Sequence, residues 1–358
     1  MKFIVKREDL KSLTRIITTI FGKSNIGILF VVEKKSKEVL VSCGEKNTWL
    51  NYKIPATECE HGSFAVDYSS ICNITFPKDT VSFALVDSAI ELKSGAFTSK
   101  MSVTIDPKDV LKAKPLKLIK VNNRIDPAVL SSGISALNYA AILAGKDTKD
   151  LTVKITKSGE LILSTNDSYR GGVFKATTKL DRFKISVDFD AMKNLMGIIA
   201  GAKQAELGTD SKQIRIKTGA IDCQLPTFQT KKDSSAEEFM AQLPKNSKVS
   251  FLVDSAKYKT AIESMSSIAA NTKANELKIE SVVQGSKVSM KAEMSGNKAS
   301  YNLKVQKKEG KDHKFFISNK MVLDLLGLAS GIIKLTVFDK VALISSTKLD
   351  AKYVFPLL

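Results

Sequence analysis

The segment Leu161–Phe174, LILSTNDSYRGGVF, contains an apolar strand, a polar turn and a second apolar strand. Apolar runs on either side of a small polar cluster are typical of a β-hairpin or a strand–turn unit. The pair Tyr169-Arg170 precedes two glycines, beside which a ligand can approach the backbone closely, so the segment indicates a surface built for contact. The alternative interpretation is an ordinary turn with an exposed arginine.

Around this segment, a helix followed by a strand pair is predicted three times along the chain. The helix starts are Glu8-Asp9, Asp126-Pro127 and Asp254, because acidic residues and a first-turn proline favour the beginning of a helix. These starts lie roughly 120 residues apart, which is the signature of an internal repeat. Each predicted helix is followed by a run that alternates or stays apolar around a polar turn, as half-buried hairpins do.

A second helix start follows in each repeat, at Val66-Asp67, Val187-Asp188 and Ile317-Ser318. In all three places an apolar strand end precedes an Asp or Ser that can cap a helix. Another hairpin pattern then closes each repeat, so the predicted fold is α+β, with one unit used three times. We expect domains at residues 1–120, 121–245 and 246–358, joined by basic connectors at residues 106–123 and 230–247.

Charge is the unusual feature of the composition. The chain has 358 residues with 55 Lys and Arg against 37 Asp and Glu, a net charge of +18. The excess is +6, +4 and +8 in the three predicted domains, so it is not confined to a tail. A distributed positive charge favours a polyanion such as nucleic acid, bound by a surface to which every domain contributes.

The sequence offers little for catalysis, metal binding or membrane insertion. Its four cysteines form no CxxC pair, and its two histidines lie far apart, so no metal site or other cofactor is expected. Phosphate-binding, protease and hydrolase motifs are absent, as is a paired acid–base constellation, so the chain is predicted not to be an enzyme. We also expect neither a secretory signal nor a membrane span.

The order and spacing of these features resemble the bacterial beta sliding clamp, the processivity ring of replicative DNA polymerases. The start MKFIVKREDL is similar to that of the family. STNDSYRGGVF resembles the family's TDGHRLA-type segment, with Asp167 and Arg170 aligned and Tyr169 where histidine is usual. LPKN at Leu243–Asn246 resembles the entry to the third domain, and YVFPLL at Tyr353–Leu358 the family's YVVMPMRL-type end.

The resemblance implies three domains of one fold per chain and a ring of two chains joined head to tail. Twelve helices would line a hole around double-stranded DNA, and phosphate contacts independent of sequence would let the ring slide. The partners implied are a replicative DNA polymerase and a clamp loader ATPase, in the cytoplasm of a bacterium or a phage-infected host. The residues expected to contact DNA are Lys11, Arg15, Lys23, Lys146, Lys149, Lys193, Lys203, Lys257 and Lys320. The alternative for each is an ordinary solubilising side chain.

The resemblance also implies a pocket between the second and third domains, where short peptide motifs of the partners dock. The residues carried over to this pocket are Tyr169, Arg170, Gly171, Pro244, Val354, Phe355, Pro356, Leu357 and Leu358. Apolar side chains around a proline-stiffened tail suit a peptide anchor. The head-to-tail contact is expected to involve Met101 and Val103 of one chain with Ile268 and Ala269 of the next.

The chain departs from the family in several ways. Gly171 replaces a common Leu, which we interpret as room for a ligand, and the usual Arg before the last residue is missing. Small or less bulky residues stand at the expected contact between chains, and the chain is basic where the family is commonly acidic. A divergent, phage-encoded member fits these departures. The prediction is a DNA sliding clamp that confers processivity; the alternative is a monomeric clamp-fold factor that holds DNA by charge without closing a ring.

Overall fold

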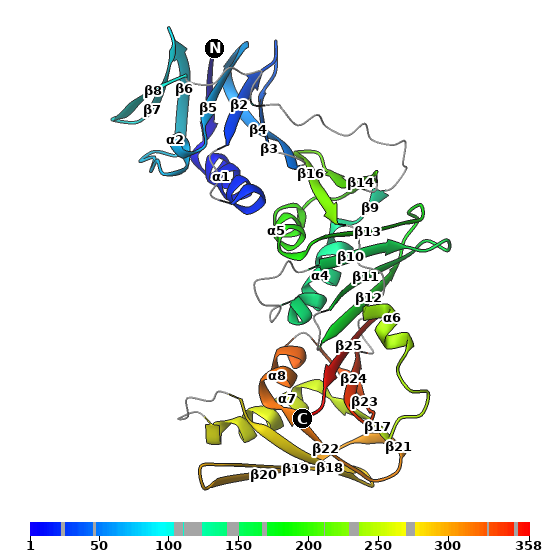
Figure 1. Cartoon of the computed structure of the whole chain (residues 1–358). Helices are drawn as coiled ribbons and strands as arrows, with labels where there is room; N and C mark the ends of the chain where they lie inside the picture. The colour runs from blue at the N-terminus through cyan, green and yellow to red at the C-terminus, as the bar shows by residue number, and fades with distance from the viewer. Residues whose placement is uncertain are drawn as a thin grey trace. The chain divides into compact units, whose positions relative to one another are not determined.

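The computed structural model (Figure 1) describes most of the chain. The described residues are 1–22, 26–45, 48–103, 110, 124–141, 150–166, 170–210, 212–228, 236–269, 276–327, 329–346 and 350–358. Four of the predicted site residues, Lys23, Lys146, Lys149 and Tyr169, lie outside them. The contacts divide the chain into two compact units: unit 1 is Met1–Ser131, Lys179–Asp181 and Asp190–Phe228; unit 2 is Ser132–Thr178, Arg182–Phe189 and Gln229–Leu358.

The same order of elements occurs three times along the chain. The first repeat is β1 (Lys2–Lys6), α1 (Arg7–Phe21), β2 (Gly27–Val32), β3 (Glu38–Glu45), β4 (Thr48–Glu60), β5 (Gly62–Asp67), α2 (Ser69–Cys72), β6 (Thr80–Val86), β7 (Ala89–Ser94) and β8 (Phe97–Ser102). The second is β9 (Arg124–Ile125), α4 (Pro127–Ala141), β10 (Asp150–Ile155), β11 (Glu160–Asn166), β12 (Gly171–Thr177), β13 (Phe183–Asp188), α5 (Phe189–Ile199), β14 (Ala205–Thr209), β15 (Gln213–Lys217) and β16 (Ile221–Phe228).

The third repeat follows the short helix α6 (Ala236–Ala241) and keeps the same order with two additions, η1 and β21. It is β17 (Val249–Asp254), α7 (Ser255–Ser266), η1 (Ser267–Ala269), β18 (Lys278–Gln284), β19 (Lys287–Met294), β20 (Asn297–Lys304), β21 (Gln306–Gly310), β22 (His313–Ser318), α8 (Asn319–Leu326), β23 (Ile332–Val337), β24 (Val341–Ser346) and β25 (Ala351–Pro356). The predicted α+β fold of three repeats is therefore confirmed. The residues at which the three domains begin and end stay a prediction, since the second repeat contributes to both units.

Strand pairing is also repeated, because each repeat forms two antiparallel ladders of four strands. The first ladders run β4-β3-β2-β5, β12-β11-β10-β13 and β20-β19-β18-β22. The second ladders run β8-β7-β6-β1, β16-β15-β14-β9 and β25-β24-β23-β17. Each predicted hairpin thus gains further strands, and a short strand precedes the first helix of every repeat.

Helix starts agree with the local sequence signals. The Asp126 carboxylate accepts a hydrogen bond from the N–H of Ala128 (2.8 Å), and that of Asp254 accepts one from Lys257 (3.0 Å). The Ser318 hydroxyl accepts one from Met321 (3.5 Å). These caps satisfy backbone donors that have no partner inside the helix. α1 and α2 differ, because neither has a side-chain cap; α1 begins at Arg7 after Lys6, and α2 has only four residues.

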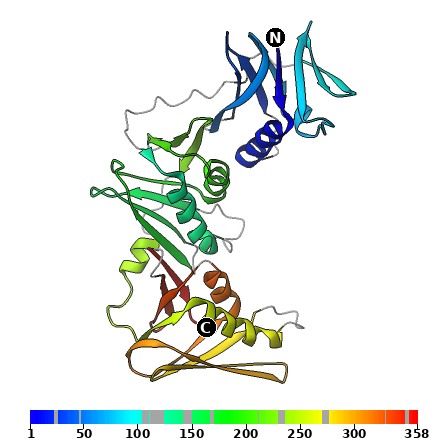
Figure 2. The ribbon, with the colours of Figure 1, turned by 180° about the vertical axis from the view of Figure 1, so that it is seen from behind.

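The cores lie between the helices and the ladders. In the first repeat Phe3, Phe30, Phe64 and Phe83 are at most 2% exposed, and their ring centroids lie 4.8–6.4 Å apart. They come from β1, β2, β5 and β6, so one aromatic cluster joins both ladders. In the third repeat, α7 and α8 cover one face of the β20-β19-β18-β22 ladder (Figures 1 and 2). None of the described helices is long and apolar enough to cross a membrane.

Candidate functional sites

Two strand pairings join consecutive repeats. In unit 1, β16 of the second repeat pairs with β4 of the first, with Ile221 opposite Tyr52 and Gln224 opposite Trp49. In unit 2, β25 of the third repeat pairs with β12 of the second, with Gly171 opposite Val354. In both cases the closing strand of one repeat extends the open edge of the repeat before it. The segment from Leu161 to Phe174 supplies that edge in unit 2.

The basic residues predicted to contact DNA are exposed wherever the structure describes them. Lys11 and Arg15 lie on α1, Lys193 on α5, Lys203 just after α5, Lys257 on α7 and Lys320 on α8. Five of the six residues lie on helices and Lys203 lies four residues beyond the end of α5; in unit 2, α7 packs against α8. Exposed cations at the ends of flexible side chains suit phosphate contacts without base reading.

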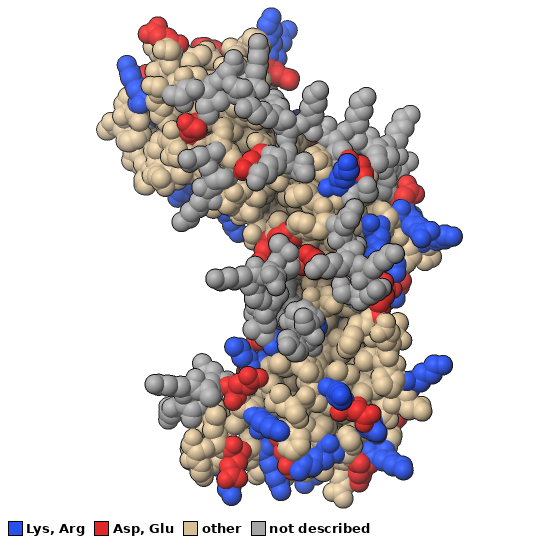
Figure 3. Space-filling view, in the orientation of Figure 1, with Lys and Arg blue, Asp and Glu red and all other residues tan. Residues whose placement is uncertain are grey.

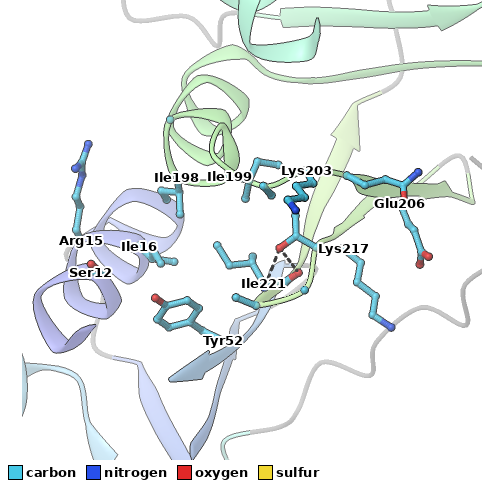
Figure 4. Close-up of a pocket in the computed structure, with 16 residues that line it drawn as sticks. Ser12, Arg15, Ile16, Tyr52, Ile198, Ile199, Lys203, Glu206, Lys217 and Ile221 are labelled. Carbon is cyan, nitrogen blue, oxygen red and sulfur yellow. Dashed lines mark hydrogen bonds between the residues drawn. The ribbon is translucent and has the colours of Figure 1, made fainter. Parts of the chain in front are cut away.

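Arg15 and Lys203 line the same cavity of unit 1, which has a volume of about 850 Å³. Figure 4 shows Ile16, Ile198 and Tyr52 facing the space between α1 and α5, whereas Arg15 extends outward. Lys217 and Glu206 also lie on its edge and extend away from the floor (Figure 4). Burial, followed by the charge of Asp9, raises the pKa of Tyr52, so its hydroxyl stays neutral. The cavity thus combines an apolar floor with edges that are mostly basic.

The sequence did not indicate Tyr52, Ile198 or Lys217 as part of such a site. Tyr52 lies on β4, Ile198 on α5 and Lys217 on β15. β4 of the first repeat is brought to these elements of the second repeat by its pairing with β16. Predicting these residues from the sequence would require knowing that β4 pairs with β16, because neither of these two strands carries a recognisable motif.

Arg170 corrects one interpretation of the opening segment. It is only 5% exposed, so the alternative of a turn with an exposed arginine is wrong. Gly171 and Gly172 begin β12 and are buried. The two glycines thus belong to an interior strand, β12, which lies between β11 and β25.

Gly171 lies close to two neighbouring elements. A Cβ atom at this position would lie 3.0 Å from the Cβ of Ala236 on α6 and 3.2 Å from Cγ1 of Val354 on β25. The space beside the glycine is thus filled by α6 and β25, and the idea that it is open to a ligand is not supported. The missing side chain lets α6 pack on the sheet.

Replacing Gly171 with Leu is expected to destabilise the protein by about 1–3 kcal/mol, because overpacking would push Ala236 or Val354 away. Thermal or denaturant unfolding of the whole chain measures this cost. The control is Gly201→Leu, since a Cβ there has nothing within 4 Å. Equal stability of the two variants would contradict the close packing of α6.

The C-terminal pocket residues fall into a buried and an accessible group. Val354 and Phe355 are at most 1% exposed and belong to the core of unit 2, whereas Leu358 is 48% exposed. Pro356 and Leu357 are half-buried, and Pro244 is exposed. The backbone of the tail is held in place, because the N–H of Leu357 donates to Lys340 (2.9 Å) and that of Leu358 to Phe316 (3.1 Å). The accessible part of the predicted pocket is therefore its last residues and Pro244.

The residues predicted at the contact between chains lie in or beside two edge strands, β8 and β20. Met101 is in β8 and Val103 directly follows it, while Ile268 and Ala269 form part of η1, which contacts β20. Met101, Val103 and Ile268 are partly exposed, and Ala269 is buried. Within the described residues, β8 pairs only with β7 and β20 only with β19. Both edges are thus available for another strand.

No protein-family model and no curated protein matches this sequence. Solved structures match over the whole chain. A sliding clamp (DNA polymerase III subunit beta) from Pseudomonas aeruginosa bound to griselimycin has a TM-score of 0.85 at 17% identity, covering 100% of this chain and 99% of that one. A DNA polymerase sliding clamp from Bacillus subtilis gives 0.84 at 16% identity, with 100% and 99% covered.

A third solved structure, the beta subunit from the DNA polymerase of Streptococcus pyogenes, gives a TM-score of 0.84 at 13% identity, with both chains fully covered. The expected resemblance to the bacterial beta sliding clamp is thus confirmed for the fold. The low identity agrees with a divergent sequence.

Proposed function

We propose that this chain is a DNA sliding clamp without enzymatic activity. Two copies join head to tail around double-stranded DNA and tether a replicative DNA polymerase, after loading by a clamp loader ATPase. The fold shared with DNA polymerase III beta subunits supports this function. The site of action is the cytoplasm of a bacterium or of a phage-infected cell.

The strand pairing between repeats is the observation that carries the proposal. β16 extends the edge of β4, and β25 extends the edge of β12. By the same rule, β8 of the first repeat extends the β20 edge of the third repeat in a second copy. A head-to-tail contact of this kind uses one pairing geometry throughout, and closed symmetric assemblies are the usual outcome for homo-oligomers. The expected mass of the dimer is twice 39.1 kDa, which light scattering measures directly.

The charge of the chain supports a loose hold on DNA. The six described basic residues, five on helices and Lys203 after α5, are exposed and carry no motif for reading bases. Contacts between lysines and phosphates are independent of sequence and weaken with salt. Such contacts let a ring move along the duplex.

Reversing the charge of Arg15 and Lys203 together, as Arg15→Glu and Lys203→Glu, is expected to weaken binding to duplex DNA. Two lost phosphate contacts reduce the slope of log K against log salt by about 2. Fluorescence anisotropy with a labelled duplex at several salt concentrations measures this slope. The matched control is Lys157→Glu with Lys340→Glu, two exposed lysines away from the predicted DNA contacts. An equal loss in the control would show that only net charge matters.

The second candidate is a monomer that holds DNA electrostatically, and the net charge of +18 favours it. Such a monomer would scatter light as one chain at micromolar concentration. It would dissociate from circular and linear DNA at the same salt concentration, because it is not topologically linked to the DNA.

A further inference from the structure

The outer face of the first ladder, opposite the helices, is covered in two of the three repeats. In the first repeat, Val110 of the connector packs on Leu29 and Ala65. In the second repeat, Ala236 and Met240 of α6 pack on Ile162 and Val173. In these two repeats the outer face therefore carries apolar residues, and the segment that follows the repeat buries them.

The third repeat differs, because its outer face is polar and rich in lysine. The register places Lys291 beside Glu280 and Ser300, and Lys287 beside Gln284 and Lys304. Side chains alternate between the faces of a ladder, and Val288, Met290 and Leu303 point to the buried side. The outer face thus carries six exposed lysines, which are Lys278, Lys287, Lys291, Lys298, Lys304 and Lys314, against Glu280 and Glu293.

Only part of this charge is neutralised within the described chain. Lys314 pairs with Glu280 at 2.7 Å, and Lys298 pairs with Glu293 at 3.5 Å. The other four lysines have no carboxylate partner among the described residues. With six lysines against two glutamates, the described face as a whole remains positive. In Figure 3, Lys and Arg side chains project along the lower part of the view, over the region where Figure 1 places β18 and β19.

The face is also hollowed. A depression of about 620 Å³ is lined by three lysines, two glutamates and one phenylalanine, among others: Lys278, Lys291, Lys298, Glu280, Glu293 and Phe316. The Nζ of Lys278 lies 4.2 Å from the centre of the Phe316 ring, and the Nζ of Lys314 lies 5.1 Å from it. These cation–π contacts hold both ammonium groups over the Phe316 ring, which lines the depression together with Lys278. The site therefore combines positioned cations with one aromatic ring.

We propose that this outer face binds single-stranded nucleic acid, with single-stranded DNA as its ligand on a clamp. Positive grooves with an aromatic side chain are the usual platform for single strands. A flexible strand follows a twisted sheet, whereas duplex DNA is stiff over about 150 base pairs and meets such a surface at few points. An anionic membrane or a peptide would need apolar anchors, but Val282 and Phe316 are the only large apolar side chains on the described face.

The proposal goes beyond the closed ring and does not depend on it. The lysines chosen for its test, Lys278, Lys287 and Lys291, lie on β18 and β19, away from the open edge of β20. A loss of single-strand binding and a loss of ring closure are therefore separate results.

The test compares two triple variants of the full chain with the unmodified protein. One is Lys278→Gln, Lys287→Gln and Lys291→Gln; the control is Lys157→Gln, Lys212→Gln and Lys340→Gln, with the same change in charge at exposed positions elsewhere. Anisotropy of a labelled 20-nucleotide oligothymidylate is measured at several salt concentrations. We expect the first variant to lose about tenfold or more in affinity and about 2 in the salt slope, since each phosphate contact contributes about 0.7 for single strands.

The control variant should keep its affinity for the oligonucleotide within about threefold, and both variants should stay on nicked circular DNA like the unmodified chain. Equal losses in the two variants would overturn the proposal, because the effect would then follow net charge alone. Binding of the unmodified chain to vesicles with one quarter anionic lipid, lost in the first variant while oligothymidylate binding persists, would also overturn it and assign the face to membranes.

Discussion

Replacing Ser102 with proline is expected to convert the proposed head-to-tail dimer into single chains. Val103 donates its N–H to the carbonyl oxygen of Ser88, which directly precedes the neighbouring strand β7 (3.1 Å). Because hydrogen-bonded pairs alternate along an antiparallel ladder, the N–H of Ser102 points to the open side of β8. Proline removes this donor and is tolerated on an edge strand, so the β7–β8 ladder should survive while pairing with β20 of a second copy is lost.

Light scattering should then report 39.1 kDa for the variant, whereas the unmodified chain is expected to give twice that mass. The control is Ser102→Ala, which keeps the N–H and should remain dimeric. Thermal unfolding of both variants tests whether the single chain is still folded. A folded Ser102→Pro protein that remains a dimer would contradict strand pairing at this edge.

The second large effect is expected at the end of the tail. Leu358 is 48% exposed and Leu357 is half-buried, and both are held by backbone hydrogen bonds. We expect a partner peptide to bury these side chains. Replacing both with Ser then removes about 3 kcal/mol or more of the binding free energy that comes from apolar burial, and the affinity falls about a hundredfold. Primer extension by a replicative polymerase should then lose its long products, while retention on nicked circular DNA is unchanged.

The substitutions must stop short of Phe355. That side chain is fully buried in β25, so deleting Phe355–Leu358 would remove a core phenylalanine and cost about 3–5 kcal/mol in stability. A suitable control is Val86→Ser, which alters a 45% exposed apolar residue in another part of the chain. Full processivity of the Leu357→Ser, Leu358→Ser variant would remove the tail from the polymerase site.

The repeat was predictable because its signals are local. Asp126, Asp254 and Ser318 each precede an apolar helix pattern and cap it as expected. The apolar runs around polar turns likewise identify hairpins. Tertiary context was not needed for any of these, which is why the α+β unit could be predicted from the sequence at low similarity to known structures.

The features that join the repeats were not predictable in the same way. The pairing of β16 with β4 and of β25 with β12 depends on strands far apart in the sequence. The burial of Arg170 and the packing of Ala236 beside Gly171 follow from that pairing and from α6. Local patterns also could not distinguish the covered outer faces of the first two repeats from the lysine-rich face of the third, because the cover comes from a separate segment.

The most direct test of the central claim, that two chains close into a ring around duplex DNA, is retention on nicked circular DNA. The chain is bound to a nicked plasmid and passed over a sizing column in salt high enough to remove loose electrostatic binding. A sliding clamp should stay with the circle and be released when a restriction enzyme linearises it. Release from circular and linear DNA at the same salt concentration would contradict the ring.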